Sequence, residues 1–244
     1  LIRRLGRTVR RLQKPDGFFW SHLDPRSGRG YLPRGHVPLF APGEAFLALA
    51  LLQGHSPAED MAAAVRRAAD FWASGRDRWY EDHDLPMVVA DSWSLAALDA
   101  LHLLGLATRR HTDYCFFLAE EILARQETPA TARWPDHVGA PAEAGKAPDV
   151  GTTAACCEGL VAAWRLARRM GVPAARYRRG ALLAARFVLA HQFDRVNAYL
   201  VRNPGRALGS FYSSYADLGI RMDEVQHAVS ALLGVAALLE AEEP

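Results

Sequence analysis

Apolar side chains recur every three or four residues along most of this chain, and this period constrains its fold more than any other feature. The pattern is clear in residues 43–53, 95–104 and 160–167. Such spacing places apolar side chains on one face of an α-helix. No stretch of clean alternation competes with it, and β-branched residues rarely cluster. The sequence therefore predicts an all-α protein.

Helix start and stop signals divide the chain into eight helices. They are predicted to cover residues 1–14, 43–53, 57–74, 91–105, 109–126, 152–170, 173–192 and 222–240. Short connections alternate with four long ones, at residues 15–42, 75–90, 127–151 and 193–221. Long loops in a compact domain are usually functional or disordered. Their strict alternation with tight turns predicts four helix–long loop–helix units.

The helices that follow the long loops share a frame. Each has a polar or aromatic residue, then a small one, an apolar one, any residue, Ala, and an apolar or small residue. The first position of this inner-helix frame is occupied by Glu44, Trp93, Glu158 and His227. A fixed frame at regular intervals is typical of repeat architectures.

The helices that precede the long loops share a second frame, in which a Gln is followed by an aromatic residue. Gln13 precedes Trp20 by seven residues, and Gln126 precedes Trp134 by eight. Gln192 stands seven residues before Tyr199. The second unit lacks the Gln.

A Gln at a helix end with an aromatic residue a few positions later resembles the QW-type repeats of terpenoid cyclases. The alternation of helix pairs is similar to α/α toroids generally, including six-hairpin glycosidases, sugar epimerases, lanthionine synthetases and protein prenyltransferases. The stretch "GSFYSSYADLGIRMDEVQH" also resembles the ends of uncharacterised bacterial toroid proteins. The resemblance implies inner helices around a central cavity, with long loops walling its mouth.

This chain departs from those families in three respects. It has neither the Asp-x-Asp-Asp motif of squalene-type cyclases nor the Cys…Cys-His pattern of lanthionine synthetases. Eight helices also fall short of the twelve in a complete six-hairpin toroid. We therefore expect one domain over residues 1–244, a partial α/α toroid of about four helical hairpins with its long loops on one face. A further segment or a second subunit could complete the ring.

Composition narrows the range of partners. At 244 residues a single core is feasible, and a net charge of +2 gives no general attraction to nucleic acid or membrane. Three cysteines make no disulfide framework, so we expect a reducing, cytoplasmic compartment. The sequence starts at Leu1 rather than Met, so a signal peptide could precede it. The expected partners are a small-molecule or saccharide substrate and a second copy of the chain, with neither nucleic acid nor membrane.

The first-frame residues are the candidates for catalysis. We expect them in the first turns of the inner helices, where the helix dipole favours carboxylates. Glu158 is the predicted acid/base, with Glu44 or Asp223 as its partner carboxylate. His227, one turn after Asp223, is the predicted second proton-transfer group.

Other residues are candidates for holding the substrate. Trp93 could stack on a sugar face and Arg221 could bind an anionic group. Asp91, Tyr215 and Trp20 complete the predicted substrate-binding set. No cofactor or metal is expected. Such a set fits hydrolysis, elimination or epimerisation of a polar, saccharide-like substrate, and the sequence does not choose among them.

Structural explanations compete with these assignments. Carboxylates in a first helical turn commonly act as dipole partners without chemistry. Cys156 and Cys157 could join a zinc site or supply a nucleophile, but buried helical Cys usually acts as a small hydrophobe. The run "YEDHDLP" at residues 80–86 could bind a cation or lie in solvent. The basic stripe of the first helix could grip phosphates or simply face water.

Two other function classes remain open. A terpenoid cyclase- or prenyltransferase-like enzyme would need an aromatic-walled cavity with a strong acid motif or zinc. A non-catalytic toroid module would bind a peptide or partner protein across its concave face. Convergent carboxylates favour the acid–base enzyme over both.

Overall fold

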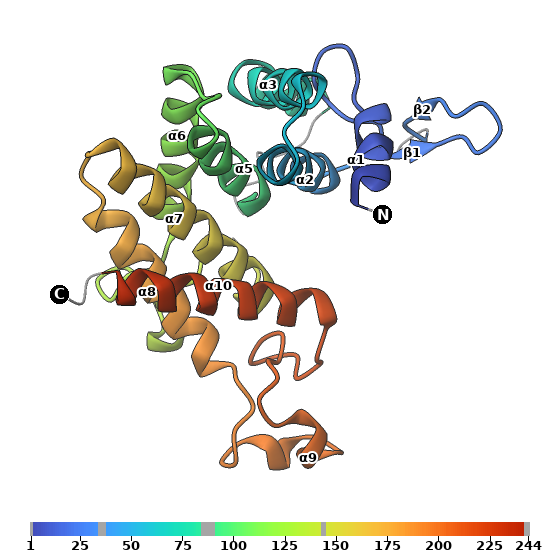
Figure 1. The fold of residues 1–244 in the computed structure, drawn as a ribbon. Helices are drawn as coiled ribbons and strands as arrows, with labels where there is room; N and C mark the ends of the chain where they lie inside the picture. Colours follow the sequence, from blue (N-terminus) through green and yellow to red (C-terminus); the bar gives the residue numbers. More distant parts are fainter. Residues whose placement is uncertain (1, 34–37, 84–90, 143–144, 242–244) are drawn as a thin grey trace. The chain divides into compact units, whose positions relative to one another are not determined.

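The structure is a computed structural model that describes residues 2–33, 38–83, 91–142 and 145–241 (Figure 1). This part of the chain is mostly helical, which confirms the all-α prediction. Its ten α-helices are α1 (Ile2–Arg11), α2 (Ala41–His55), α3 (Glu59–Ser74), α4 (Arg76–Glu81), α5 (Ser92–Leu103), α6 (Arg109–Arg125), α7 (Val150–Met170), α8 (Ala175–Ala190), α9 (Pro204–Ala207) and α10 (Met222–Glu240). Short 3-10 turns lie at Pro135–His137 and Ala198–Leu200. The described residues also contain one short antiparallel pair of strands, β1 (His22–Leu23) and β2 (Gly30–Tyr31).

The chain divides within α6 into two compact units, Leu1–Leu118 and Ala119–Pro244. Each unit has buried helical residues of its own, and the single domain over residues 1–244 stays a prediction. Each predicted helix overlaps an observed one, and the two short helices α4 and α9 lie inside predicted long loops.

In the first unit, α2 and α3 form a helical hairpin and α2 also packs beside α5. The direction of α5 follows from two contacts. Gly43 near the start of α2 lies against Trp93 at the start of α5, and Gly54 at the other end of α2 lies nearest Leu104. α2 and α5 are therefore parallel. Phe46 and Trp72 form part of the core between α2 and α3, with ring centroids 5.4 Å apart.

The second unit repeats this arrangement. α7 and α8 form a hairpin through a turn at Gly171, whose φ of 67° closes the helix in the left-handed conformation. α10 packs along α7. Gly151 lies beside Glu224, and ten residues later Val161 lies beside Gly234, so α7 and α10 are also parallel.

The three Gln residues of the second predicted frame make the same local structure, which we call the Gln clasp. Each forms an antiparallel β-bridge across its loop, pairing Gln13 with Phe19, Gln126 with Pro141, and Gln192 with Phe211. In each clasp the side-chain amide donates to the carbonyl of a glycine two residues before the bridge partner. These glycines are Gly17, Gly139 and Gly209, with φ of 98°, 100° and 83°.

Two of the clasps also fasten the loop to a later helix of the same unit. The Gln13 amide donates to Ala64 O in α3 at 2.8 Å, and the Gln126 amide donates to Gly180 O in α8 at 2.9 Å. The clasp at Gln192 has the bond to its own glycine. The sequence predicted these three residues as a repeat, and the structure gives them one shared local geometry, which in two of the three also ties the loop to another helix.

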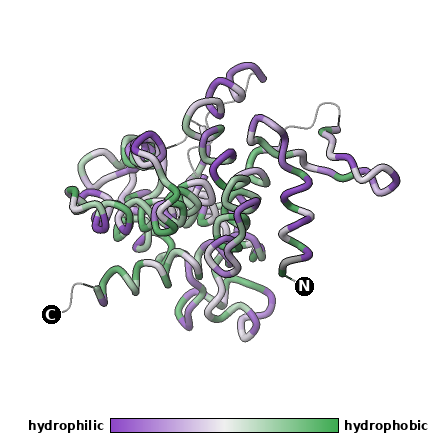
Figure 2. The backbone as a smooth tube through the Cα atoms, turned by 45° about the horizontal axis from the view of Figure 1, so that its top comes forward, coloured by the Kyte–Doolittle hydropathy of each residue, from purple (hydrophilic) through white to green (hydrophobic). Residues whose placement is uncertain are grey.

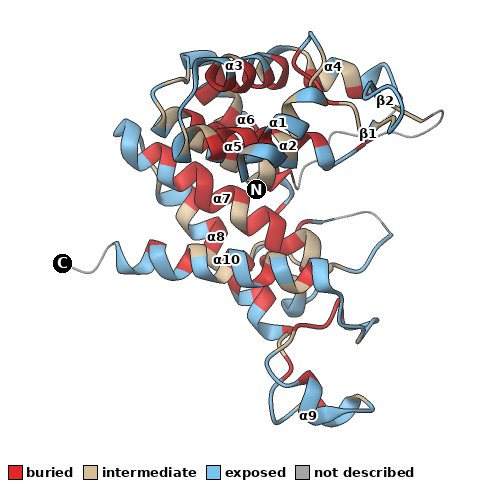
Figure 3. Cartoon of the chain, turned by 45° about the vertical axis from the view of Figure 1, so that its right-hand side comes forward, coloured by how far each residue is buried: buried red, intermediate tan, exposed pale blue. Residues whose placement is uncertain are grey.

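α10 differs from α2, α5 and α7 in its exposure. It is the one helix among the described residues that is long and apolar enough to cross a membrane, a test that core helices of soluble proteins also pass. Figure 2 shows its mainly hydrophobic colouring, and Figure 3 shows exposed residues along one side. Leu233 is 67% exposed.

Candidate functional site

A carboxylate and a histidine meet where α7 and α10 pack. Glu158 Oε2 lies 2.7 Å from His227 Nδ1. Both side chains are largely buried, 11% and 18% exposed. α7 begins at Val150, so Glu158 stands in the third turn rather than in the expected first or second. The two residues share the first position of the inner-helix frame, and the parallel packing of the helices brings them into contact.

This pair has the geometry of an oriented proton-transfer group. A carboxylate at Nδ1 favours the tautomer that carries its proton on Nδ1, so that Nε2 is the proton acceptor. The same carboxylate stabilises a positive charge on the ring. The pair takes one residue from α7 and one from α10, which explains why neither helix alone reveals it.

A second buried carboxylate lies at the start of α10. Glu224 is 8% exposed and accepts a hydrogen bond from Ser213 Oγ at 2.9 Å. Burial raises the pKa of Glu224, and the Ser213 bond opposes that rise. Its other oxygen, Oε2, has no hydrogen-bond partner within the described structure. The sequence did not single out Glu224, which is the inward-facing acid of this helix start.

Asp223 and Arg221 lie on the surface beside it. Arg221 donates to Asp223 at 3.0 Å, and both side chains are more than 60% exposed. That bond holds the pKa of Asp223 below its usual value. Asp223 was predicted to share a face with His227, but the partner of His227 is Glu158. One residue along a helix turns a side chain by about 100°, and this rotation exchanges Asp223 for Glu224 as the buried acid.

An aromatic cluster surrounds His191 at the end of α8. The ring of Tyr215 lies 4.3 Å from that of His191, and the ring of Tyr212 lies 5.0 Å from it. His191 is fully buried, its Nδ1 lies 2.9 Å from Phe187 O, and its Nε2 has no partner in the described structure. Burial lowers the pKa of His191. Tyr215, a predicted substrate contact, is half exposed at the edge of this cluster.

The other two first-frame residues lie in the first unit. Glu44 is exposed on α2, and Trp93 is partly buried on α5. Gly43, the neighbour of Glu44, packs against Trp93 Cβ. The frame therefore aligns neighbouring helices in both units. The convergence of all four residues on one cavity stays a prediction.

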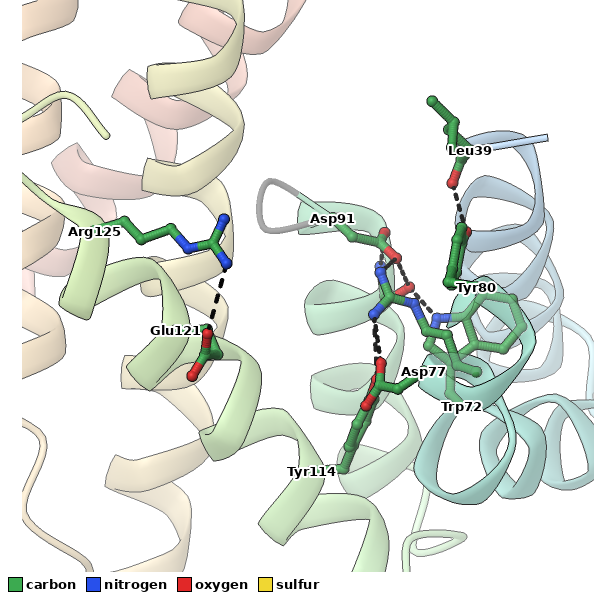
Figure 4. Close-up of polar contacts among 10 residues, drawn as sticks. Leu39, Trp72, Asp77, Tyr80, Asp91, Tyr114, Glu121 and Arg125 are labelled. Carbon is green, nitrogen blue, oxygen red and sulfur yellow. Dashed lines mark hydrogen bonds and ion pairs between the residues drawn. The ribbon is translucent and has the colours of Figure 1, made fainter. Parts of the chain in front are cut away.

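Asp91 belongs to a buried network rather than to a surface (Figure 4). Its carboxylate caps α5 by accepting from Ser94 N at 3.1 Å, and it pairs with Arg76 at 3.1 Å. Arg76 is fully buried and also bonds Tyr114 and Asp77. Buried charges need such paired partners. Asp91 is only 1% exposed and is bonded within this network, which favours a structural role for it.

Arg76 also explains the missing Gln of the second unit. It follows Ala64 by twelve residues, the same interval that separates Gly180 from Gln192. A buried arginine with two carboxylates and a tyrosine thus stands at the clasp position. Burial beside this network raises the pKa of Tyr80 to about 12.

The remaining candidates have local explanations. Trp20 is partly buried beneath Lys14, whose Nζ lies 5.2 Å from its ring. Cys157 is buried, donates to Ala181 O, and has its pKa raised by burial, which is the opposite of an activated thiol. In the polar loop run, His83 Nδ1 lies 2.7 Å from Trp79 O, and residues 84–86 lie outside the described residues.

Comparison with known proteins gave no relative. No family model matches the chain, and neither the curated proteins nor the solved structures contain a match.

Proposed function

We propose that this chain is a helical-hairpin enzyme of α/α-toroid type that uses His227 and Glu158 for acid–base chemistry on a polar substrate. The observation that carries the proposal is the 2.7 Å contact between Glu158 and His227, made by equivalent positions on neighbouring inner helices. An oriented and largely buried His–carboxylate pair suits proton transfer near neutral pH.

Two features support the fold part of the proposal. Inner helices run parallel in both units, and Gln clasps fasten successive hairpins. Both are expected of helical hairpins arranged around a common axis.

The polar character of the surroundings favours a hydroxyl-rich substrate such as a saccharide. Glu224 and Arg221 at the start of α10, and Ser213 bonded to Glu224, offer hydrogen-bond donors and acceptors. Tyr215 offers an exposed aromatic face that could stack on a sugar ring.

The test is an activity screen of the whole chain on mono- and oligosaccharides, scored for hydrolysis, elimination and epimerisation. Glu158→Gln and His227→Gln should each lower kcat/KM at least 100-fold on any substrate found. Glu121→Gln removes a similar charge from an acid on α6 that pairs with Arg125, and it should leave activity unchanged. Melting temperatures of all three variants show that folding is intact. Turnover that survives both site variants would refute the proposal.

A further inference from the structure

α10 exposes the face that every other inner helix buries. The third position of the inner-helix frame is held by Phe46, Leu95, Leu160 and Val229. The first three are 0% exposed, whereas Val229 is 46% exposed. Leu233, one turn later, is 67% exposed. An exposed apolar stripe at helical spacing commonly marks a binding surface.

The structure shows what covers this position elsewhere. Phe46 contacts Trp72 on α3, the outer helix of its own hairpin. Leu160 lies against Gly180 on α8, again the outer helix of its hairpin. Because Val229 holds the same frame position as Phe46 and Leu160, we expect an outer helix to pack on the stripe through Val229.

The Gln192 clasp also indicates a missing outer helix beside α10. At Gly139, an added Cβ would collide with Leu183 O of α8, because that helix packs directly on the clasp. At Gly209, an added Cβ would have no neighbour within 4 Å. The Gln192 clasp is thus assembled in the same way as the Gln126 clasp but has no outer helix against it in the described residues.

α1 has the complementary exposed face. Counted back from the Gln that follows each outer helix, Ile2 and Leu5 correspond to Ala181 and Ala184 of α8. Both alanines are 0% exposed, whereas Ile2 is 59% and Leu5 is 56% exposed. α1 packs on α2 near Gly6, but no helix of the described residues covers its side at Ile2 and Leu5.

The charges of the two helices are also complementary. α1 contains five arginines and no acidic residue. The charged residues of α10 are all acidic: Glu240 is exposed, Asp223 is exposed and paired with Arg221, and Glu224 is buried. Opposite charge steers association and selects the partner.

We propose that α10 of one copy packs against α1 of a second copy, restoring an inner–outer hairpin between two chains. This contact joins two different surfaces. Made reciprocally, it closes two copies into a ring with two-fold symmetry, and made in one direction it builds larger rings or open chains. A lipid surface is the less favoured occupant, because an anionic membrane would repel the acids of α10. The proposal does not depend on any catalytic activity.

The test is the molar mass of the full chain in solution, measured by light scattering at micromolar concentration. The wild type should exceed 26.8 kDa. Leu233→Glu on α10 and Leu5→Glu on α1 should each weaken association at least 30-fold and give monomers. Both positions are exposed, so folding should survive, as circular dichroism can confirm. Leu51→Glu, at a 58% exposed position of α2, is the matched control and should associate like the wild type.

Mixing the two variants makes the test specific. One copy then offers an intact α10 and the other an intact α1, so a complex of twice the chain mass should reappear. A wild type that is monomeric at all concentrations would overturn the proposal, as would association that survives both variants. Failure of the mixture to recover would equally count against it. So would binding of the wild-type monomer to anionic vesicles that Leu233→Glu abolishes.

Discussion

At the scale of single residues, the clasp glycines allow a matched comparison. Gly139 and Gly209 both have φ near +90°, which disfavours any side chain. Only Gly139 also lies against the backbone of Leu183. Gly209→Ala should therefore cost about 1 kcal/mol of unfolding free energy, and Gly139→Ala about 3 kcal/mol or more. Urea unfolding measures both, and equal losses would show that α8 does not press on the clasp.

The buried His191 should make the folding stability of the protein sensitive to acid. Its pKa is lowered by burial, so the unfolded chain binds this proton more readily than the folded one. Stability should therefore fall as pH drops below about 6.5, the usual value for histidine. Nearby Asp136 and Asp149 oppose the shift, whereas His137 adds to it.

The variant His191→Phe keeps an aromatic ring in the cluster and removes the titrating group. Its unfolding free energy should depend less on pH between 6.5 and 5 than that of the wild type. An unchanged dependence would assign the acid sensitivity to other groups.

At the scale of elements, each Gln clasp should contribute to the unfolding free energy in proportion to the number of carbonyls that its side-chain amide bonds. Gln126 is 8% exposed and bonds two carbonyls, one in its loop and one in α8. Gln192 bonds one. Gln126→Ala should thus lower the unfolding free energy by about 2–3 kcal/mol, and Gln192→Ala by less than about 1 kcal/mol. Chemical denaturation of the two variants measures both losses. A larger loss for Gln192→Ala would refute the equivalence of the clasps.

Much of the element level could be predicted from the sequence, because helix periodicity and capping signals are local. Asp149 caps α7 and Gly171 ends it. The Gln repeat was also visible, although its purpose became clear only from contacts with residues about fifty positions away. α2 starts before its predicted residue, since Pro42 is compatible with a first helical turn.

The site was only partly predictable. The shared frame placed Glu158 and His227 at equivalent positions, but their contact depends on how α7 and α10 pack. Glu224 was missed because the choice between it and Asp223 is a matter of helix rotation about the core. Asp91 could not be told from a site residue, because its partner Arg76 lies in a different helix.

At the scale of the whole molecule, a small net charge hides a strongly uneven distribution. The chain is +2 overall, yet α1 is wholly basic and α10 wholly acidic among their charged residues. If these helices meet between copies, raising the salt from 50 to 500 mM should weaken self-association several-fold. Sedimentation velocity at both salt concentrations measures this. Stronger association at high salt would mean that apolar contact alone holds the copies together.

The central claim is that α7 and α10 together build an oriented Glu158–His227 pair, and nitrogen NMR of the histidine rings tests it most directly. In the wild type at neutral pH, the neutral form of His227 should carry its proton on Nδ1. Glu158→Gln should shift the ring toward the Nε2–H tautomer, while Glu121→Gln should leave it unchanged. A His227 ring that is Nε2–H in the wild type and insensitive to Glu158→Gln would contradict the pair and the function built on it.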